Sequence, residues 1–562
     1  MAPVRLSRLL LVLLCALGTP GAYAQLSPQH IELQWHQLEN KYAETESAGE
    51  FVPTPPVPFQ ASAKLAGDPQ TAFLAKILMI RAAKSTIDIA TYEFLEEAAS
   101  YAVLCELKHA LDRGVSVRIL ADSVASANLV HPSLKALIAL QKHNKSVRRQ
   151  TGNLSVKLFN SVTDWRTKVQ GAWATVRNMF TPPDWDINVP KNWINRRLHD
   201  KLMLIDGQRT FDALVMVGGR NINGKAHGVP HVDVHTYLDM DILLKSFEGA
   251  ELGPQTYSYF EKLFYHIGNR KLEPNFWGDV RMAFSFPDQQ KKILTGMDDL
   301  FRMNPALKTK LESMERENYL AWGFSGGKTE LVHEIQNIVA RDWLTGWILE
   351  DPANRNPNGS SISKVFANYL RKAKKSVVVV SPYLFLNERE GDRILEWLLA
   401  DRTRKLTLVT NSNLTIDNIL AQIITDHGTV DKILKSRKWE AVVGQVRIYQ
   451  YGKLDDRRFG GQEMYGLMHA KYAVIDDQIA IVTTSNSDPR SRIWNSEVGY
   501  ITHNAPIAAQ LNAFTDYIIS RSYLWGTNDW LVVKYMTPTL VPALLQPILY
   551  QIMEISKFVN LM

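Results

Sequence analysis

One arrangement of residues occurs twice in this chain of 562 residues. Each copy has a histidine, a lysine two residues later, and an aspartate after four further residues. The copies are His199, Lys201 and Asp206 in the first half and His469, Lys471 and Asp476 in the second. A single match of this length is weak evidence, but a match in each half indicates a shared chemical role.

These residue types suit the cleavage of an anionic phosphodiester. A neutral imidazole can attack phosphorus to form a phosphohistidine, which divides one difficult step into two. A second imidazole, when protonated, can supply the proton that the leaving alkoxide needs. Lysine and asparagine side chains can bind the non-bridging oxygens, and the candidates are Lys201, Lys471, Asn221 and Asn486. This chemistry requires no cofactor or metal, and the motifs contain no carboxylate cluster dedicated to one.

Both motifs are expected to lie in β-hairpins. His199 and Lys201 are two residues apart, so on one strand they would share a face. Turn signals at 206–207 and 476–477 lead into apolar return strands, after which the two asparagines follow. Each aspartate lies at the turn, an odd number of residues from its histidine. We therefore expect Asp206 and Asp476 to be structural clamps rather than reacting groups.

The elements around the motifs also repeat. The first half has an expected helix at 71–84, a strand at 85–92, a helix ending at Gly114 and a strand at 115–120. The second half has an expected helix at 363–375, a strand at 376–383, a helix at 391–402 and a strand at 406–410. This alternation favours an α/β fold with a sheet flanked by helices, and so long a repeat indicates a duplicated domain.

The motifs and the residues that follow them resemble the phospholipase D superfamily, and most closely its bacterial cardiolipin synthase branch. The matching segments are 468–476, 485–491 and 495–497 in the second half, and 218–221 and 237–241 in the first. The resemblance covers roughly residues 68–525. It implies two phospholipase D-like lobes, each a mixed β-sheet flanked by helices, with one active site at their pseudo-two-fold interface. Thr483 stands where the family usually has glycine, and residues 160–195 and 222–236 look like additions.

The resemblance also implies roles for individual residues. Each histidine needs an orienting partner on its other ring nitrogen. By resemblance Glu497 serves His469, and Asp239 is the best match for His199, with Asp241 as its rival. In the family the first-half histidine is usually the nucleophile, so His199 is expected to attack and His469 to act as acid and then base.

Composition and the N-terminus limit the classes of protein. Hydrophobic residues make up 46% and charged residues 22%, ordinary globular values that exclude a disordered chain or a disulfide scaffold. The net charge of +7 fits anionic partners such as phospholipid headgroups or nucleic acid. Residues 1–24 have the basic, apolar and small-residue regions of a secretory signal, with an uncleaved anchor as the alternative. We expect an exported protein, periplasmic or secreted and peripheral to a membrane, in which Cys105 is the only cysteine after cleavage.

The expected domain boundaries follow from these patterns. Residues 25–67 are expected to form a proline-rich N-terminal arm, in which residues 51–60 are extended and form no element. The two lobes are expected at 68–330 and 331–525, followed by an apolar C-terminal extension at 526–562. The stretch 540–562 is a poor membrane span; it could lie on a bilayer or cover the domain, and covering is favoured.

Other motifs are weaker. Ser325 lies in a Gly-x-Ser-x-Gly sequence that we interpret as a loop, and the following Gly-Lys-Thr lacks the first glycine of a phosphate loop. Four tryptophans, Trp165, Trp173, Trp185 and Trp193, could line an acyl pocket, dip into a membrane interface or simply pack. His227, His231 and His235 are interpreted as exposed loop residues rather than a metal site.

The sequence thus predicts a phospholipase D-type enzyme that acts on glycerophospholipids by cardiolipin synthase-like phosphatidyl transfer. Water as the acceptor would make it a phospholipase D. One alternative is a phosphodiester nuclease of the same superfamily, although two motifs in one chain argue mildly against it. The other is an inactive lipid-binding protein, which the complete motifs oppose. The expected partners are a phospholipid substrate and a membrane surface, without nucleic acid, and the expected state is a monomer with an internal pseudo-dimer.

Overall fold

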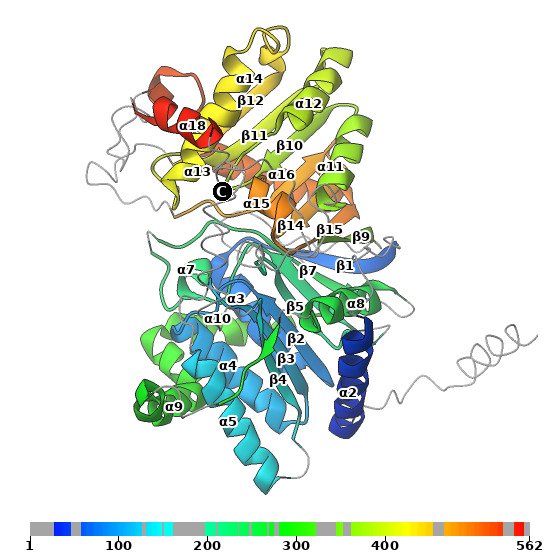
Figure 1. The fold of residues 1–562 in the computed structure, drawn as a ribbon, viewed down its shortest axis with the longest axis vertical. Coiled ribbons are helices and arrows are strands. Elements are labelled where there is room, and N and C mark those ends of the chain that lie inside the picture. Colours follow the sequence, from blue (N-terminus) through cyan, green and yellow to red (C-terminus); the bar gives the residue numbers. More distant parts are fainter. Residues whose placement is uncertain are drawn as a thin grey trace, which may run out of the picture.

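The two halves of the chain form two lobes that share one mixed β-sheet (Figure 1). The computed structural model describes residues 27–45, 58–125, 131–148, 151–160, 197–209, 212–233, 235–246, 250–266, 269–274, 280–321, 344–351, 361–452, 466–531 and 545–555. Within these residues the sheet has sixteen strands, eight from each lobe. The predicted duplicated α/β fold is therefore confirmed.

The strand order is the same in both lobes when read outward from the junction. In lobe 1 it is β1 (Phe59–Ala66), β7 (Asp241–Ser246), β6 (Leu214–Gly218), β5 (Lys201–Ile205), β2 (Thr86–Thr91), β3 (Ser116–Asp122), β4 (Leu154–Phe159) and β8 (Arg270–Lys271). In lobe 2 it is β9 (Leu344–Asp351), β15 (Glu497–His503), β14 (Ile479–Thr483), β13 (Tyr472–Ile475), β10 (Ser376–Val380), β11 (Lys405–Asn411), β12 (Val446–Tyr451) and β16 (Ser522–Leu524). The strands β2, β3 and β4, like β10, β11 and β12, run parallel, and the other pairs are antiparallel. This shared order gives every strand of one lobe an equivalent in the other.

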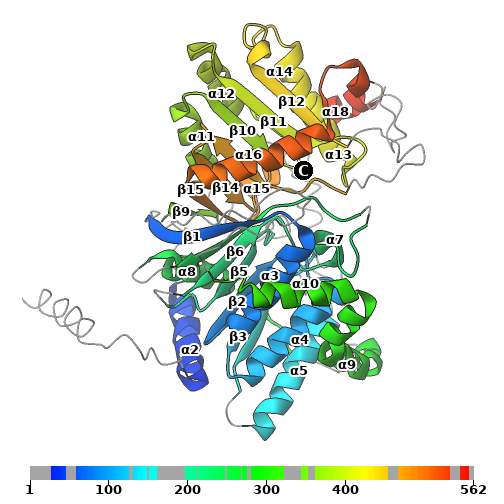
Figure 2. The same ribbon diagram turned by 180° about the vertical axis from the view of Figure 1, so that it is seen from behind.

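Helices cover both faces of the sheet. Those of lobe 1 include α3 (Pro69–Ala82), α4 (Ala98–Asp112), α5 (Pro132–Val147), α7 (Gly224–His227), α8 (Leu252–Phe264), α9 (Val280–Met303) and α10 (Pro305–Arg316). Those of lobe 2 include α11 (Ser361–Lys372), α12 (Glu388–Ala400), α13 (Ile419–Ile423), η2 (Ile424–Val430), α14 (Asp431–Lys435), α15 (Pro489–Ile493), α16 (Ala505–Ser520) and α18 (Gln546–Ile555). In Figure 2 the long α16 crosses the side of lobe 2 opposite to α11 and α12. The helices and strands expected from the repeated pattern are found within a few residues of their predicted bounds.

Side-chain caps begin several of these helices. Asp68 accepts the Thr71 N–H at 2.6 Å at the start of α3. Asn387 and Glu390 form a reciprocal capping box at the start of α12. Such caps satisfy backbone N–H groups that have no partner within the helix.

The N-terminal arm was predicted wrongly. The strand β1 lies at the centre of the sheet, between β7 and β9, and the helix α2 (Pro28–Thr45) precedes it. Ala61, Ala63 and Leu65 of β1 are buried in the central core. Apolar and polar residues alternate along β1, but small residues such as alanine give little strand signal. The dense prolines before Phe59 indicated an extended arm instead. Residues 51–57 lie outside the described part of the chain.

The junction joins the lobes through both backbone and core. β1 pairs with β9 in antiparallel register, with Phe59 opposite Gly346 and Ala61 opposite Leu344. The central core contains Val217 from lobe 1 together with Val474 from lobe 2. The hydroxyl groups of Thr256 and Tyr500 also meet across the junction at 2.6 Å. The lobes are thus halves of one packed body.

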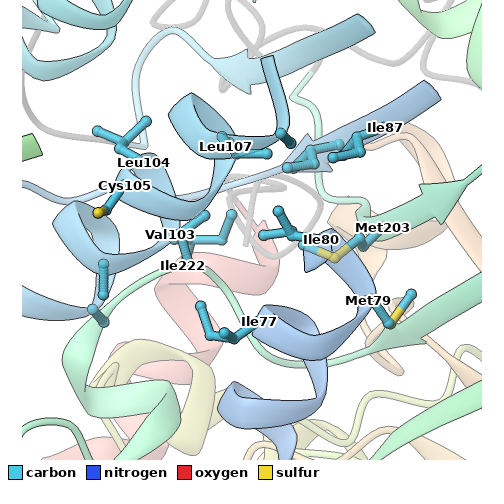
Figure 3. Close-up of a cluster of buried hydrophobic side chains, with 14 of the residues drawn as sticks. Ile77, Met79, Ile80, Ile87, Val103, Leu104, Cys105, Leu107, Met203 and Ile222 are labelled. Carbon is cyan, nitrogen blue, oxygen red and sulfur yellow. The ribbon is translucent and has the colours of Figure 1, made fainter. Parts of the chain in front are cut away.

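A second core lies beneath lobe 1, between its sheet and the helices α3 and α4 (Figure 3). Ile77 of α3, Val103 of α4 and Met203 of β5 are all buried there. Ile222, which follows Asn221, completes this layer. Cys105 is buried in the same core as a free thiol.

The C-terminal helix α18 rests on lobe 2. Tyr550 and Met553 pack against Ile423 and Ile424, which agrees with the expectation that the extension covers the domain. Among the described residues, no helix combines the length and hydropathy that a membrane crossing would need. The expected secretory signal, the Ser325 motif, the Gly-Lys-Thr sequence after it and the four tryptophans at 165–193 fall outside the described residues.

Candidate active site

The two motif histidines meet at the junction of the lobes. His199 lies just before β5, and its N–H donates to the Ser496 carbonyl of the other lobe at 3.2 Å. His469 lies just before β13, and its N–H donates to the Leu238 carbonyl at 2.7 Å. The expectation that His199 and Lys201 share one strand was therefore wrong for the histidine. Each histidine belongs to an irregular segment that is hydrogen-bonded to the opposite lobe.

The orienting carboxylates are exchanged relative to the expected pairing. His199 Nδ1 contacts Glu497 Oε1 at 2.9 Å and Oε2 at 3.0 Å, whereas His469 Nδ1 contacts Asp239 Oδ2 at 2.8 Å. The predicted pairs, Glu497 with His469 and Asp239 with His199, are wrong. The cause is the backbone bridges of Leu198 with Ser496 and of Leu238 with Met468, which bring each carboxylate into the opposite lobe's motif.

The rival carboxylate, Asp241, has a structural role. It lies 3.3 Å from Lys76 Nζ and 3.2 Å from Arg220 Nη1. Arg220 also donates to the Asp239 carbonyl at 2.7 Å. Arg220 therefore fixes the backbone of the residue that orients His469, a role that the sequence analysis did not assign to it.

The carboxylate contacts determine which ring nitrogen can react. An ionised carboxylate only accepts hydrogen bonds, so Nδ1 of each imidazole must carry hydrogen. Nε2 then remains for chemistry, with a lone pair when the ring is neutral. This is the arrangement that a nucleophilic histidine and an acid–base histidine both require.

Burial and neighbouring charges shift both rings toward the neutral form. Burial, followed by the charges of Lys201 and Lys471, lowers the pKa of His199 well below its ordinary value. Burial and Lys471 also lower the pKa of His469, although Asp239 opposes this. Burial disfavours ionised Asp239, but His469 and Lys471 outweigh burial and lower its pKa. The lowered pKa of His199 favours the neutral form that a nucleophile needs.

The two lysines are held beside the histidines. Lys201 Nζ donates to the His199 carbonyl at 2.7 Å, and Lys471 Nζ donates to the His469 carbonyl. Burial lowers the pKa of Lys201 to about 8 and that of Lys471 to about 7. An arriving phosphodiester monoanion would offset part of this cost of burying two positive charges.

The asparagines complete the two sets. The Asn221 side-chain oxygen accepts the Glu93 N–H at 3.3 Å. The equivalent Asn486 oxygen is buried and has no hydrogen-bond partner among the described residues. Since a buried polar atom is costly without a partner, Asn486 is suited to a polar group brought by a ligand.

Asp206 and Asp476 are confirmed as structural clamps. Asp206 accepts the backbone N–H groups of Lys84, Ser85 and Thr86 at 3.0, 2.7 and 2.9 Å. Asp476 does the same for Lys374, Lys375 and Ser376 at 2.7, 2.6 and 3.0 Å. Both aspartates have a φ of 53°, in the left-handed region that turn residues such as Asp and Asn tolerate. Each clamp fixes a motif turn to the start of the neighbouring strand.

Two positioning residues were not identified from the sequence. Asp122, at the end of β3, accepts the Leu198 N–H at 2.9 Å. Asn411, at the equivalent end of β11, accepts the Met468 N–H at 3.0 Å. Each bond fixes the residue before a motif histidine. The sequence signal for both positioning residues was a polar residue at the end of an apolar parallel strand.

The two halves of the site are not identical. A Cβ on Gly219 would lie 2.3 Å from the Asp239 carboxylate, so glycine is required there. The equivalent Thr484 instead donates its hydroxyl to Glu497 at 2.6 Å. The departure at Thr483 is accommodated by a hydrogen bond to the Val498 carbonyl at 3.1 Å.

A further carboxyl is present only in the first half. Asp200, between His199 and Lys201, accepts the Tyr259 hydroxyl at 2.6 Å and the Ser496 hydroxyl. The second motif has Ala470 at this position. Burial raises the pKa of Asp200 to about 7. Asp200 therefore links the first motif to the segment that contains Glu497.

The three loop histidines do not join the site. His231 and His235 are exposed as expected, but His227 is only 1% exposed, so its predicted exposure is wrong. It lies at the end of α7, packed against Phe73. In the part of the chain that the structure describes, no three His, Cys, Asp or Glu side chains are grouped to hold a metal ion.

The fold and the site define a duplicated two-lobe protein with one paired-histidine centre. The family described as "Cardiolipin synthase, PLD-like domain" matches residues 77–246 and 366–518, more than half of the chain. The chain belongs to this family, within the phospholipase D superfamily.

Several relatives share most of their length with this chain. Cardiolipin synthase C of Escherichia coli K12 is 20% identical over 472 residues, 82% of this chain and 86% of the relative. An uncharacterised Helicobacter pylori J99 protein is 23% identical over 461 residues, 81% of this chain and 78% of the relative. The crystal structure of phosphatidylserine synthase from Haemophilus influenzae has a TM-score of 0.56 at 13% identity and covers 93% of this chain and 99% of its own. At 13% identity, the similarity to the phosphatidylserine synthase structure shows a shared fold alone.

Proposed function

We propose that this protein is a phosphatidyltransferase or phosphodiesterase that acts on glycerophospholipids through a phosphohistidine on His199. The observation that carries the proposal is the pair of buried imidazoles, each held at Nδ1 by a carboxylate from the opposite lobe. One relative that shares most of its length with this chain is named as a cardiolipin synthase, which supports a phospholipid as the substrate.

The first step forms the covalent intermediate. His199 Nε2 attacks phosphorus, and the bond from phosphorus to the leaving alkoxide breaks. Protonated His469 gives its Nε2 proton to that alkoxide, while Glu497 stabilises the positive charge that develops on His199. Lys201 and Lys471, with Asn221 and Asn486, bind the non-bridging oxygens.

The second step releases the product. Neutral His469 takes the proton of an acceptor hydroxyl, whose oxygen attacks phosphorus and breaks the phosphorus–nitrogen bond. A lipid hydroxyl as the acceptor gives phosphatidyl transfer, and water gives hydrolysis. Exclusion of water and binding of the acceptor determine the ratio of these products.

The proposed setting is outside the cytoplasm at a membrane surface. The secretory-signal features of residues 1–24 and the net charge of +7 support this. Fractionation of cells that express the full-length chain tests this setting, with recovery in the periplasm or medium as the expected result.

The test compares two substrates with matched variants. Purified protein is incubated with phosphatidylglycerol vesicles, with and without glycerol, and separately with DNA. Lipid turnover without DNA cleavage is expected, and DNA cleavage without lipid turnover would overturn the proposal in favour of a nuclease. His199→Ala and His469→Ala should each abolish turnover, whereas Ser325→Ala should leave it unchanged.

The intermediate provides a second measurement. Rapid quenching with phosphate-labelled lipid should trap label that is stable in alkali and labile in acid, as expected for phosphohistidine. The label should be absent from His199→Ala protein. Acid-stable label on serine would contradict the mechanism.

A further inference from the structure

The layers beneath the sheet differ between the lobes. In lobe 1 the space between the sheet and the helices α3 and α4 is filled by a continuous apolar core (Figure 3). The equivalent layer of lobe 2, between the sheet and the helices α11 and α12, has an apolar core as well, but it also contains a cavity of about 540 Å³. This volume falls within the ~300–1,000 Å³ of typical ligand pockets.

Smaller side chains in lobe 2 account for the cavity. In β5, Met203 lies opposite Ile89, and at the same point of lobe 2 Ala473 lies opposite Val379. Ala367 of α11 is the equivalent of Ile77 of α3, because each lies the same number of residues before the strand that follows its helix.

The residue that follows the site asparagine is also smaller in lobe 2 than in lobe 1. Ile222 bridges to Phe94 in lobe 1, and Ser487 bridges to Leu384 in lobe 2. Ala367, Ala473 and Ser487 all line the cavity. As a result Val379 is only partly buried, whereas the equivalent Ile89 is 1% exposed.

The lining of the cavity includes a residue of the candidate active site. Asn486, whose side-chain oxygen is buried without a partner among the described residues, lines the cavity together with Ser485 and Ser487. Thr484, next to them, donates to the carboxylate that orients His199. A molecule that fills the cavity can therefore place a polar group beside Asn486.

Apolar and charged side chains both line the cavity. The apolar ones include Ile362, Phe366, Leu370, Val379, Ile394 and Ile481. Lys364, Arg371, Arg389 and Arg393 also line it, from α11 and α12, together with the ion-paired Arg492 and Glu390. Apolar cavities favour apolar occupants over water, and the excess of cationic side chains favours an anionic headgroup nearby.

We infer that this cavity binds one fatty acyl chain of the glycerophospholipid whose phosphate is held at the paired histidines. This inference rests on the proposed function, and it assigns the acyl-binding subsite to lobe 2 alone. The chain lies between α11, α12 and the sheet, and its glycerol end lies near Asn486.

The test fills the cavity with the side chains that lobe 1 already accommodates. The double variant Ala367→Ile with Ala473→Met is compared with wild type on dioleoyl phosphatidylglycerol in detergent micelles and on monomeric dihexanoyl phosphatidylglycerol. We expect kcat/KM for the long-chain lipid to fall at least tenfold, while that for the short-chain lipid changes less than twofold. Leu399→Ala, at an exposed residue of α12 that does not line the cavity, is the matched control and should behave like wild type.

A binding measurement on the unfilled cavity removes the dependence on folding of the double variant. His199→Ala protein is irradiated with phosphatidylglycerol that carries a diazirine in one acyl chain, and the labelled peptides are mapped. Label on α11, on α12 or on the strands β10, β13 and β14 is expected. Label confined to other segments, or an unchanged long-to-short ratio in the folded double variant, would overturn the inference.

The outcomes also separate this inference from the proposed function. If wild-type protein turns over neither lipid, the proposed function fails, while the label on α11 still tests acyl binding. If wild-type protein turns over both lipids and the filled variant retains the same ratio, only the acyl subsite fails.

Discussion

At the scale of single residues, burial of four cationic or basic groups around one phosphate site has a consequence for pH dependence. The pKa values of Lys201 and Lys471 are lowered to about 8 and about 7, and those of both motif histidines are lowered as well. His469 must be protonated to act as the acid, and both lysines must be charged to bind phosphate. All three requirements fail as pH rises.

The first prediction is therefore a pH optimum of kcat/KM on the acid side of neutrality. The rate should fall as pH rises through about 7 to 8, since kcat/KM reports the free enzyme's groups. A pH–rate profile with a soluble phosphodiester measures this, with protein stability followed over the same range as the control. A plateau that extends beyond pH 9 would contradict the assignment of the lysines.

Asp200 gives a second prediction at this scale. Its pKa in the folded protein, about 7, lies above the ordinary value, so the folded state favours the protonated carboxyl. This contribution to stability is complete below the ordinary pKa and is lost as pH rises through about 7. Wild-type protein should lose free energy of unfolding between pH 5 and pH 8, and Asp200→Asn should remove that part of the loss. Urea unfolding at the two pH values measures both proteins, and an identical pH dependence would argue against a raised pKa.

At the scale of elements, the clamps show how a turn aspartate maintains the motif. Asp206 is 3% exposed and Asp476 is partly exposed, although both accept three backbone N–H groups. Asp206→Ala would leave buried N–H groups without partners, at a cost of about 2–4 kcal/mol of unfolding free energy. Asp476→Ala should cost less, because water can reach the freed groups. Urea unfolding of the two variants tests the order, and Asp206→Asn is the milder control because asparagine tolerates the positive φ.

Features set by local sequence patterns were predicted better than contacts between distant segments of the chain. The hairpins and the turns depend on residues close in sequence or on strand periodicity, and these were predicted. The clamping role of Asp206 and Asp476 was predicted from their turn positions, although the N–H groups that they accept lie 100 to 122 residues away. The partner of His199 depends on a backbone bridge between Leu198 and Ser496, which no local pattern encodes. The resemblance assigned Glu497 to His469, and the pseudo-two-fold arrangement of the lobes exchanges the two carboxylates. The strand β1 was missed for a related reason, since its place is determined by pairing with the distant strands β7 and β9.

At the scale of the whole molecule, the duplication explains why one chain has one site. Each lobe contributes an imidazole and the carboxylate that orients the other lobe's imidazole. Neither lobe contains a complete catalytic set, so the alignment of the junction is a condition for activity. The β1–β9 pairing and the shared core maintain that alignment.

This dependence predicts that the lobes unfold together. Leu244 of β7 is fully buried in the shared core, and Leu244→Ala should lower the free energy of unfolding by about 2–5 kcal/mol. Because that core also contains Val474 of β13, hydrogen exchange in β13 of lobe 2 should accelerate in step with exchange in β6 of lobe 1. Exposed Leu399 of α12 gives a control, since Leu399→Ala should change neither. If exchange in β13 stays at its wild-type rate while β6 opens, the lobes unfold separately, and the alignment of the two imidazoles would then depend on the local backbone bridges alone.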